Sequence, residues 1–344
     1  MRPRALLVVL ALLAPASAGA AEERDLRPVA ARAITEVVGP AYDALAREAA
    51  DQAALWRDTC ATRRDGGSVE RLGKAHRRTA DVWAEIEYLR YGPVAEDFRA
   101  ERIEHWPERR GATTRGLAAL FAEAAEPSAA SIHAASVGVQ GLPVLERLLF
   151  DAGAAERLIR ADAEGARACA IGRAVADNLA AVTAEVAAGW AGAGAIAARD
   201  PDRAREIVAR LVTDALGETQ TLIEAKLLPA MGKTTNAARP EALQGWRAGR
   251  VGAGFARPIA GLEALVPRLT AGADETATIL ATLATARSIA EDLPPDFAAA
   301  LATPKGRSRA VLLRDALRSA ASVLQSDLAA LAGVEVGFNG RDGD

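Results

Sequence analysis

The segment 136–150 is the part of this sequence in which residue types and spacing most favour a functional site. Two glycines and Pro143 interrupt an apolar run, and proline is tolerated in the first turn of a helix but not in its interior. We therefore expect a broken join at Gln140 and Gly141, followed by a helix that carries Glu146. A carboxylate among apolar neighbours needs a cation, a metal ion or backbone N–H groups as partners. The alternative is a kinked core helix in which Glu146 pairs with a structural arginine.

Two other segments combine tryptophan with charged residues. In 99–107 the charged residues include Arg102 and precede Trp106, while Trp246 and Arg247 are adjacent in the chain. An arginine can stack on an indole ring and still donate several N–H groups to an acid. Either segment could therefore hold a carboxylate, although charge runs of this kind are also common on solvated surfaces.

The sequence lacks the local motifs of common enzyme classes. It contains no Gly-x-Ser-x-Gly elbow, no His-Glu-x-x-His pair, no phosphate loop and no Cys-x-x-Cys. Residues 192–197 match a dinucleotide-binding fingerprint loosely, but no strand is expected before them. His76, His105 and His133 are too widely spaced to form a local metal cage, and we interpret them as surface or capping residues.

Composition favours a helical globular protein and excludes two other classes. Half of the 344 residues are hydrophobic but only 4% are aromatic, and Ala, Leu, Arg and Glu are abundant. A charged fraction of 25% in so apolar a chain excludes general disorder. The formal net charge of -3 argues against nucleic acid as a partner, because nucleic-acid binders carry a basic excess.

Apolar residues recur at three- and four-residue steps through most of the chain, which predicts an all-α fold. The connections are short, and short connections favour antiparallel bundles. The Gly- and Ala-rich stretch 189–198 predicts a division into an N-terminal bundle, 21–195, and a C-terminal bundle, 196–344. Gly39 and Pro40 are expected to open an amphipathic segment, and Asp200 with Pro201 is expected to form the N-cap and first turn of a later helix. The expected helices are 40–60, 68–91, 116–124, 129–138, 143–150, 155–190, 201–231, 241–250, 255–271, 274–290 and 306–332.

The first twenty residues have the pattern of a secretory signal peptide. Arg2 and Arg4 precede a short apolar run, and Ala18-Gly19-Ala20 fits a cleavage site. Cleavage after Ala20 would remove two arginines and no acid, which changes the net charge from -3 to -5. We expect a soluble exported protein with no membrane span in the mature chain, periplasmic if the source is Gram-negative. The alternative is a buried N-terminal helix.

Two cysteines, Cys60 and Cys169, are present. In an oxidising compartment an even pair suggests one disulfide, which would stabilise the fold by about 4 kcal/mol in the chain-entropy model. Two buried thiols are the alternative. A metal site is not expected, because no histidine lies near either cysteine in the sequence.

Three motifs together resemble the imelysin-like, or peptidase M75, family, in the branch described as predicted periplasmic (lipo)proteins. They are Arg-Ile-Glu-His-Trp-Pro at 102–107, Val-Gln-Gly-Leu-Pro-Val-Leu-Glu-Arg-Leu-Leu-Phe at 139–150 and Trp-Arg-x-Gly at 246–249. The resemblance covers about 25–335. It implies a duplicated four-helix-bundle fold with a site in the cleft between two bundles, export, frequent iron regulation and a role in iron uptake. It also implies a cysteine pair at Cys60 and Cys169.

The family signature, Gly-x-His-x-x-Glu, is incomplete in this chain. Its glycine falls on Gly141 and its glutamate on Glu146, but Pro143 stands at the histidine position. One carboxylate is too little for a zinc hydrolase, which uses three protein ligands. A divalent or ferric ion at Glu146 would need further ligands from elsewhere. The candidates are Glu101, Glu104 and His105.

Three classes of function follow. The first is a non-enzymatic binding protein of iron acquisition, in which Arg102 or Arg247 neutralises Glu146 and two tryptophans wall a cleft that holds a ligand or an iron-uptake protein. The second is a metal-dependent peptidase of the M75 type, and the third is an interaction role without a small ligand. The first needs Glu146 near an arginine, and the second needs it near His105 or several acids. The expected ligand-binding residues are Arg102, Trp106, Gln140, Gly141, Glu146, Trp246 and Arg247.

Overall fold

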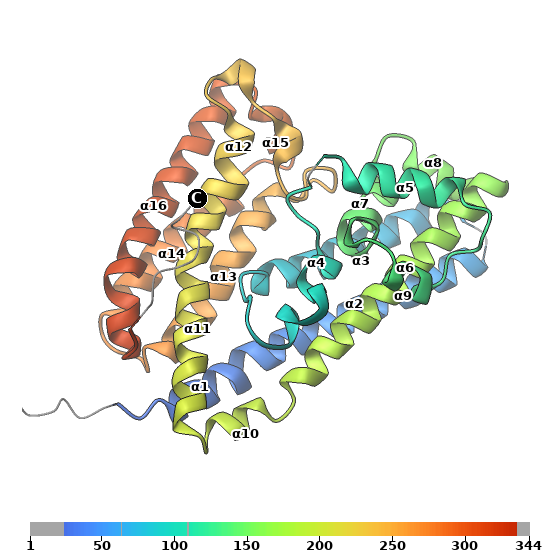
Figure 1. Cartoon of the computed structure of the whole chain (residues 1–344). Coiled ribbons are helices and arrows are strands. Elements are labelled where there is room, and N and C mark those ends of the chain that lie inside the picture. Colours follow the sequence, from blue (N-terminus) through green and yellow to red (C-terminus); the bar gives the residue numbers. More distant parts are fainter. Residues whose placement is uncertain (1–23, 63, 109, 336–344) are drawn as a thin grey trace, which may run out of the picture.

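The computed structural model describes residues 24–62, 64–108 and 110–335, and the expected signal peptide lies outside them. The described residues form helices and no strand, which confirms the all-α expectation. Two groups of long helices make two lobes, coloured blue to green and yellow to red in Figure 1.

The first bundle consists of four helices that pack on one another in a closed ring. These are α2 (Gly39–Ala61), α3 (Gly66–Ile86), α7 (Gly141–Phe150) and α9 (Ala163–Trp190). Asp65 caps α3 by accepting a hydrogen bond from Ser68 N, because the first turn of a helix leaves N–H groups without partners. Trp56 of α2 and Trp83 of α3 are among its buried core residues.

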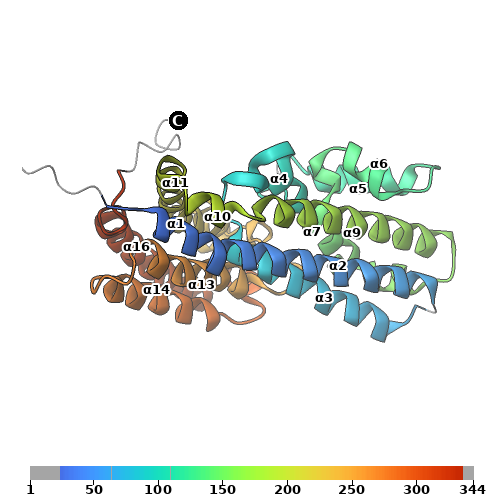
Figure 2. The same cartoon turned by 90° about the horizontal axis from the view of Figure 1, so that it is seen from below.

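The second bundle is a ring of α11 (Pro201–Gln220), α13 (Val251–Leu269), α14 (Thr276–Glu291) and α16 (Pro304–Ala332). Asp200 caps α11 through Arg203 N, as the sequence predicts. Leucines along α16 fill its core, among them Leu313, Leu317 and Leu324. Helix α3 packs against α13 and so joins the two bundles (Figure 2).

Helix α1 (Arg27–Ala33) packs against α10 (Ala193–Ala197), α11 and α13. It continues through a π-helical stretch, Ile34–Val38, directly into α2. Gly39 and Pro40 begin α2, as the sequence predicts, but the helical backbone is continuous with α1. A helix tolerates the missing N–H of this proline because the local hydrogen-bond pattern has already changed in the π-helical turn.

Other helix boundaries also differ from the sequence prediction. The segment 155–190 is split into α8 (Ala154–Ile159) and α9, because Asp162 caps a new helix. The segment 241–250 is not an α-helix, since Gly245 and Gly249 adopt left-handed conformations with φ of 68° and 65°. The shorter elements are η2 (Gly92–Phe98), α4 (Arg99–Ile103), α5 (Ala112–Ala122), α6 (Ala129–Ala134), η3 (Val137–Val139), η4 (Thr221–Leu227), α12 (Leu228–Met231), η5 (Thr235–Ala237), η6 (Pro240–Ala242) and α15 (Phe297–Ala300).

Cys60 and Cys169 form a disulfide that joins the end of α2 to α9, with a Cα–Cα distance of 5.7 Å. This resolves the two possibilities that the sequence leaves open. The segment 163–197, which includes α9, is long and apolar enough to cross a membrane by length and composition, since an 18-residue window within it has a mean hydropathy of 1.4. We interpret α9 as a core helix, because it packs along α2 and buries Leu179, Val182 and Val186.

Candidate functional site

The join before α7 has the form that the sequence predicts. Gln140 is the extended residue before the helix, and Pro143 lies in the first turn. Gly141 has a φ of 66°, and a Cβ there would lie 2.1 Å from Ile103 O and 2.4 Å from Arg102 O. Only glycine fits, because the residue combines a left-handed conformation with close contact to the end of α4.

The buried amide of Gln140 holds the preceding loop in place. Its Nε2 donates to Ala135 O at 2.9 Å and to His133 O at 3.3 Å. Its Oε1 accepts from Asn178 Nδ2 at 3.0 Å and from Arg102 Nη1 at 3.3 Å. Every polar atom of this amide thus has a partner within the protein.

Arg102 belongs to the same loop-fixing network. Besides Gln140, it donates to Asp97 O at 2.8 Å and to His133 O at 2.6 Å. The expectation that Arg102 neutralises Glu146 is wrong, because these contacts direct its guanidinium toward the 133–140 loop. Arg102, Gln140 and Gly141 do not line the cavities described below.

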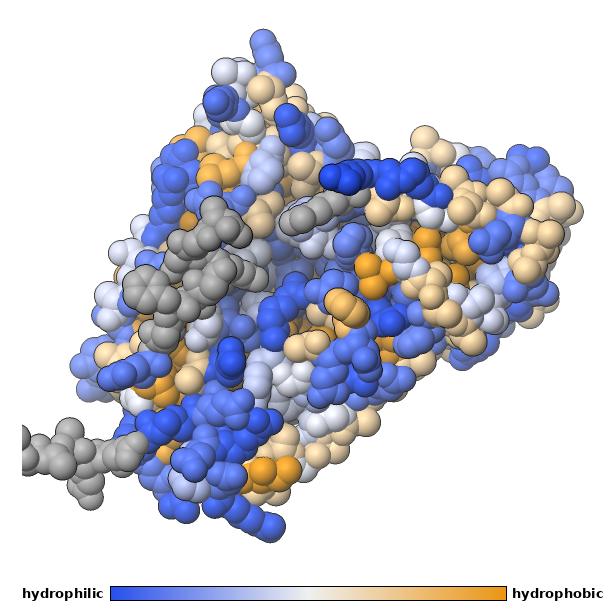
Figure 3. Space-filling view, in the orientation of Figure 1, coloured by the Kyte–Doolittle hydropathy of each residue, from blue (hydrophilic) through white to orange (hydrophobic). Residues whose placement is uncertain are grey.

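The other four expected site residues line one cavity between the two bundles. Trp106 comes from the loop after α4, Glu146 from α7, and Trp246 and Arg247 from the loop before α13. The cavity has a volume of about 550 Å³. In the space-filling view the surface recedes between the two lobes, where polar and apolar residues are interspersed (Figure 3).

Glu146 is held by the backbone rather than by a direct ion pair. Its Oε1 accepts from Ala248 N at 3.2 Å. Burial raises the pKa of Glu146, and the nearby charges of Arg247 and Arg250 partly oppose that rise. Among the residues that the structure describes, none of the arginines forms an ion pair with Glu146. The sequence alternative of a structural Arg–Glu146 pair is therefore not found either.

Arg247 pairs with Asp151 instead. Its Nε lies 2.6 Å from Asp151 Oδ1, and its guanidinium lies 4.4 Å from the centre of the Trp246 ring. The positive charge of Arg247 therefore influences Glu146 at a distance, without a direct contact. The expected ion pair between Arg247 and Glu146 is not formed. The predicted stacking of Arg247 on Trp246 is confirmed.

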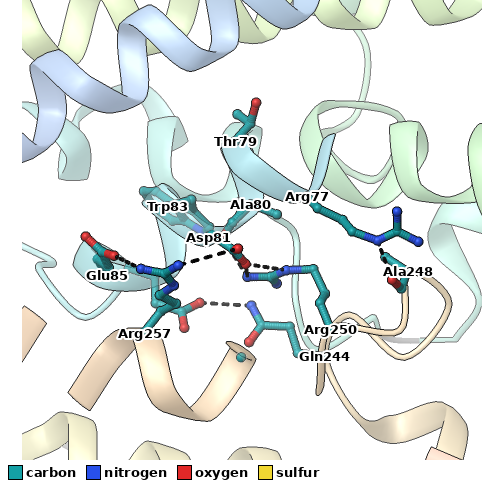
Figure 4. Close-up of polar contacts among 12 residues, drawn as sticks. Arg77, Thr79, Ala80, Asp81, Trp83, Glu85, Gln244, Ala248, Arg250 and Arg257 are labelled. Atoms are coloured by element: carbon teal, nitrogen blue, oxygen red, sulfur yellow. Dashed lines mark hydrogen bonds and ion pairs between the residues drawn. The ribbon is translucent and has the colours of Figure 1, made fainter. Parts of the chain in front are cut away.

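Two further arginines line the cavity, and each has an acidic partner. Arg147 pairs with Glu108. Arg250 donates to Asp81 Oδ1 at 2.7 Å through Nη2, and Figure 4 shows both side chains between α3 and the loop before α13. The same figure shows Arg77, whose Nε donates to Ala248 O at 2.8 Å. These contacts fix the loop that carries Trp246.

A buried polar network at the bundle interface escaped the sequence analysis. Lys226 of η4 pairs with Glu87 at the end of α3, and their side chains are 3% and 7% exposed. Gln244 Nε2 donates to Glu87 Oε2 at 2.9 Å and to Glu104 Oε2 at 2.7 Å. Trp83 Nε1 donates to the same Glu104 oxygen at 2.7 Å. Burial and the neighbouring Glu87 raise the pKa of Glu104 to about 7.

The network separates two cavities. The second has a volume of about 760 Å³ and shares Glu104, Trp106, Pro107 and Ala225 with the first. Its wall includes the π-helical stretch Thr221–Leu227, a type of helix distortion that is frequent at functional sites. Lys226 lies four and three residues after the buried Leu222 and Ile223, so the helical period of the sequence already placed this lysine on an apolar face.

The three histidines occupy different environments. His76 lines the first cavity and is only 2% exposed, so its interpretation as a surface or capping residue is wrong. Burial, with Arg250 and Arg77 nearby, lowers the pKa of His76 to about 3. His105 lines the same cavity, whereas His133 Nδ1 lies 3.2 Å from Asn178 Oδ1 in the loop network.

The side chains in the cavity do not fit a metal ion. Across 24–62, 64–108 and 110–335, no group of three His, Cys, Asp or Glu residues is placed to hold one. Glu146 lies in the field of two arginines, and the Oε2 of Glu104 already accepts two N–H groups. Glu101 does not line the cavity. We therefore derive no metal-dependent step at this site.

Comparison with known proteins agrees with this architecture. An imelysin-like protein from Psychrobacter arcticum 273-4 superposes with a TM-score of 0.75 at 21% identity, covering 91% of this chain and 97% of that one. A putative iron-regulated protein A precursor from Parabacteroides distasonis ATCC 8503 gives a TM-score of 0.71 at 13% identity with the same coverages, 91% and 97%. No curated protein matches the sequence. The imelysin family profile matches residues 38–324, and the chain therefore belongs to the imelysin (peptidase M75) family.

Proposed function

We propose that this protein is an exported, periplasmic binding protein associated with iron acquisition. In this proposal the cleft between the two bundles holds a ligand or a partner protein, and the protein has no peptidase activity. The observation that carries the proposal is the convergence of Trp106, Glu146, Trp246 and Arg247 on one cavity of about 550 Å³. Concave sites with aromatic walls and a few polar groups are the usual form of ligand sites.

The link to iron rests on the family and on one structural relative. The relative from Parabacteroides distasonis is described as an iron-regulated protein A precursor. The signal-peptide pattern of residues 1–20 supports export. Neither the description of this relative nor the signal-peptide pattern requires that the protein binds iron itself. We therefore propose a role in the process of iron uptake rather than direct binding of the metal.

The second candidate, a metal-dependent peptidase, has less support. A zinc hydrolase needs three protein ligands and an open coordination position. Pro143 supplies no ligand, and the carboxylates of Glu104 and Glu146 already accept N–H groups of the protein. A carboxylate that serves as a structural acceptor is a poor metal ligand, because coordination would break those hydrogen bonds.

Iron uptake by a deletion strain tests the proposed role. We expect lower uptake of radioactive iron and slower growth under chelator limitation, both restored by the wild-type gene. Trp246→Ala should not restore them, whereas Phe98→Ala should, because Phe98 is 69% exposed and lies outside both cavities. Equal uptake in the deletion and wild-type strains would refute the role in iron acquisition.

A direct assay separates the two candidate functions. The purified mature protein is titrated with ferrous, ferric, cupric and zinc ions and then incubated with unfolded protein substrates. We expect no tight stoichiometric metal and no cleavage that a chelator abolishes. Stoichiometric metal that is lost in Glu146→Ala, together with chelator-sensitive cleavage, would establish the peptidase instead.

A further inference from the structure

Two mostly buried carboxyl groups in the wall of the first cavity each keep one oxygen without a hydrogen-bond donor. Glu146 Oε1 accepts from Ala248 N, and Glu104 Oε2 accepts from Trp83 and Gln244. Glu146 Oε2 and Glu104 Oε1 accept no hydrogen bond from the described residues, and both atoms keep accessible surface. A mostly buried carboxyl group needs donors for both oxygens, so these two atoms indicate donors that come from a ligand.

Three carboxyl groups of the cavity wall have no cationic partner. The arginines of the wall already have acids of their own, in the pairs Arg147–Glu108, Arg247–Asp151 and Arg250–Asp81. After these pairs, Glu104, Glu146 and Glu241 remain in the wall. Glu241 is exposed, and it forms no ion pair in the part of the chain that the structure describes. The wall therefore carries negative charge that the protein does not compensate.

This negative charge is spread around the cavity. Glu104 lies in the loop after α4, Glu146 in α7 and Glu241 in η6. Within the described ranges, no three acids or histidines come close enough to hold one metal ion. A compact ion therefore cannot satisfy these carboxyl groups together. A ligand can reach several of them if its positive charges are separated along a flexible chain.

The wall between the carboxyl groups is partly apolar. Leu142, Pro143, Trp106 and Trp246 all line the cavity. Methylene groups pack well on such a surface, because their burial removes apolar area from water. An ammonium group at the end of a methylene chain donates up to three hydrogen bonds, and it does so without displacing the N–H groups that these carboxylates already accept.

We propose that the first cavity binds a linear aliphatic polyamine. Its ammonium groups donate to the open carboxylate oxygens, and its methylene groups lie on the apolar part of the wall. The volume of about 550 Å³ lies within the usual range of small-molecule sites, about 300–1,000 Å³. This inference rests on the proposed role of the cleft as a binding site and names the chemical class of its ligand. Lysine side chains of a partner protein carry the same group, and the test below separates these two sources.

Two pKa shifts are consistent with a missing cation. Burial raises the pKa of Glu146, although Arg247 and Arg250 partly oppose the rise. Burial and Glu87 raise the pKa of Glu104 to about 7. Both shifts mean that the empty cavity stabilises the ionised carboxylates less well than water does. An ammonium group beside either carboxylate would supply the positive charge that the ionised form lacks.

Calorimetric titration of the purified mature protein at about pH 8 tests the class, because Glu104 is ionised above its pKa of about 7. The probes are spermidine and putrescine, with butylamine as a monovalent control and butanediol as a neutral one. We expect spermidine to bind with a Kd of about 0.1 mM or tighter at low salt, and butylamine at least about tenfold more weakly. Butanediol should not bind measurably. No spermidine binding, or equal affinity for butanediol, would overturn the inference.

Charge-removing variants locate the binding. Glu146→Gln keeps an acceptor for Ala248 N, and we expect the Kd of spermidine to rise about tenfold or more, as for one lost charge-assisted hydrogen bond. Glu241→Gln should raise it about two- to fivefold, because an exposed charge pair is weaker. The control Glu123→Gln removes the same charge from an exposed position outside both cavities and should leave Kd unchanged. Unchanged Kd in both Glu146→Gln and Glu241→Gln would overturn the assignment to this cavity.

A blocked dilysine peptide separates the two sources of the ammonium group. We expect it to bind more weakly than spermidine, because its backbone must also enter the cavity. Tighter binding of the peptide than of spermidine would overturn the free polyamine and assign the cavity to lysine side chains of a partner protein.

The iron-uptake assay distinguishes the two proposals. If Trp246→Ala fails to restore uptake but no polyamine binds, the polyamine class is wrong and the binding role of the cleft stands. If spermidine binds, and Glu146→Gln loses this binding but restores uptake as the wild-type gene does, the polyamine site stands and the proposed link between cleft and iron fails.

Discussion

Gln244 and Glu104 join the two bundles through a single amide. The Nε2 of Gln244, in the loop before α13, lies 2.7 Å from Oε2 of Glu104, in the loop after α4. The same nitrogen lies 2.9 Å from Glu87 Oε2, so one amide holds two carboxylates of the other bundle close together. This arrangement explains why Glu87 contributes to the raised pKa of Glu104.

Glu104 should make stability depend on pH. Its pKa is about 7 in the folded protein and 4.5 as its ordinary value, so the folded state binds the proton more tightly. The stabilising contribution of the protonated Glu104 carboxyl, on the order of 3 kcal/mol, is complete below about pH 4.5 and is lost as pH rises through about 7. Glu104→Gln should remove this pH dependence. Urea unfolding of both proteins between pH 5 and 8 measures it, and parallel curves would contradict the assignment.

Lys226→Met should destabilise the fold strongly, because it leaves the buried carboxylate of Glu87 without its cation. Loss of one partner of a buried pair costs about 3–5 kcal/mol. The double variant with Glu87→Gln should recover most of that loss. Lys74→Met is the matched control, since Lys74 and Glu70 form an exposed pair worth about 0–1 kcal/mol. Equal denaturation midpoints for the two lysine variants would rule out this role of Lys226.

Gly141→Ala and Gly153→Ala separate the cost of backbone strain at positive φ from the cost of a steric clash of the added Cβ. Both glycines are left-handed, with φ of 66° and 74°, and alanine costs about 1–2 kcal/mol in that conformation. At Gly153 nothing lies within 4 Å of the added Cβ, whereas at Gly141 it meets Ile103 O at 2.1 Å. We expect Gly141→Ala to lower the melting temperature much more than Gly153→Ala. Similar melting temperatures for the two variants would show that the backbone of α4 shifts enough to accommodate the added Cβ.

Glu146→Ala should be mild in its effect on folding. The sequence alone suggests a loss of about 3–5 kcal/mol from a stranded cation. In the structure Arg247 keeps Asp151 as its partner, so the variant loses one hydrogen bond from Ala248 N, worth about 1 kcal/mol. Urea unfolding at pH 7 measures this difference. A loss above about 3 kcal/mol would show that the Glu146 carboxylate is needed to compensate the charges of Arg247 and Arg250.

Local sequence patterns determined the features that depend on neighbouring residues. The helical period predicted an all-α fold, Asp200 predicted a cap, and Gly141 with Pro143 predicted the join before α7. Each follows from backbone geometry within about one helical turn. The motifs around Trp106, Glu146 and Trp246 also indicated the segments that meet at the first cavity.

The tertiary structure alone decided which partners these residues take. Lys226 lies 139 residues from Glu87, and Gln244 lies 140 residues from Glu104. No local pattern encodes such pairs, because they exist only after α3 and α13 dock. The same docking places Arg247 in an ion pair with Asp151 rather than with Glu146. Arg102 instead forms a hydrogen bond with Gln140, in the loop before α7. Spacing along the chain fixes which face of a helix a residue occupies, and the packing of the bundles fixes what that face meets.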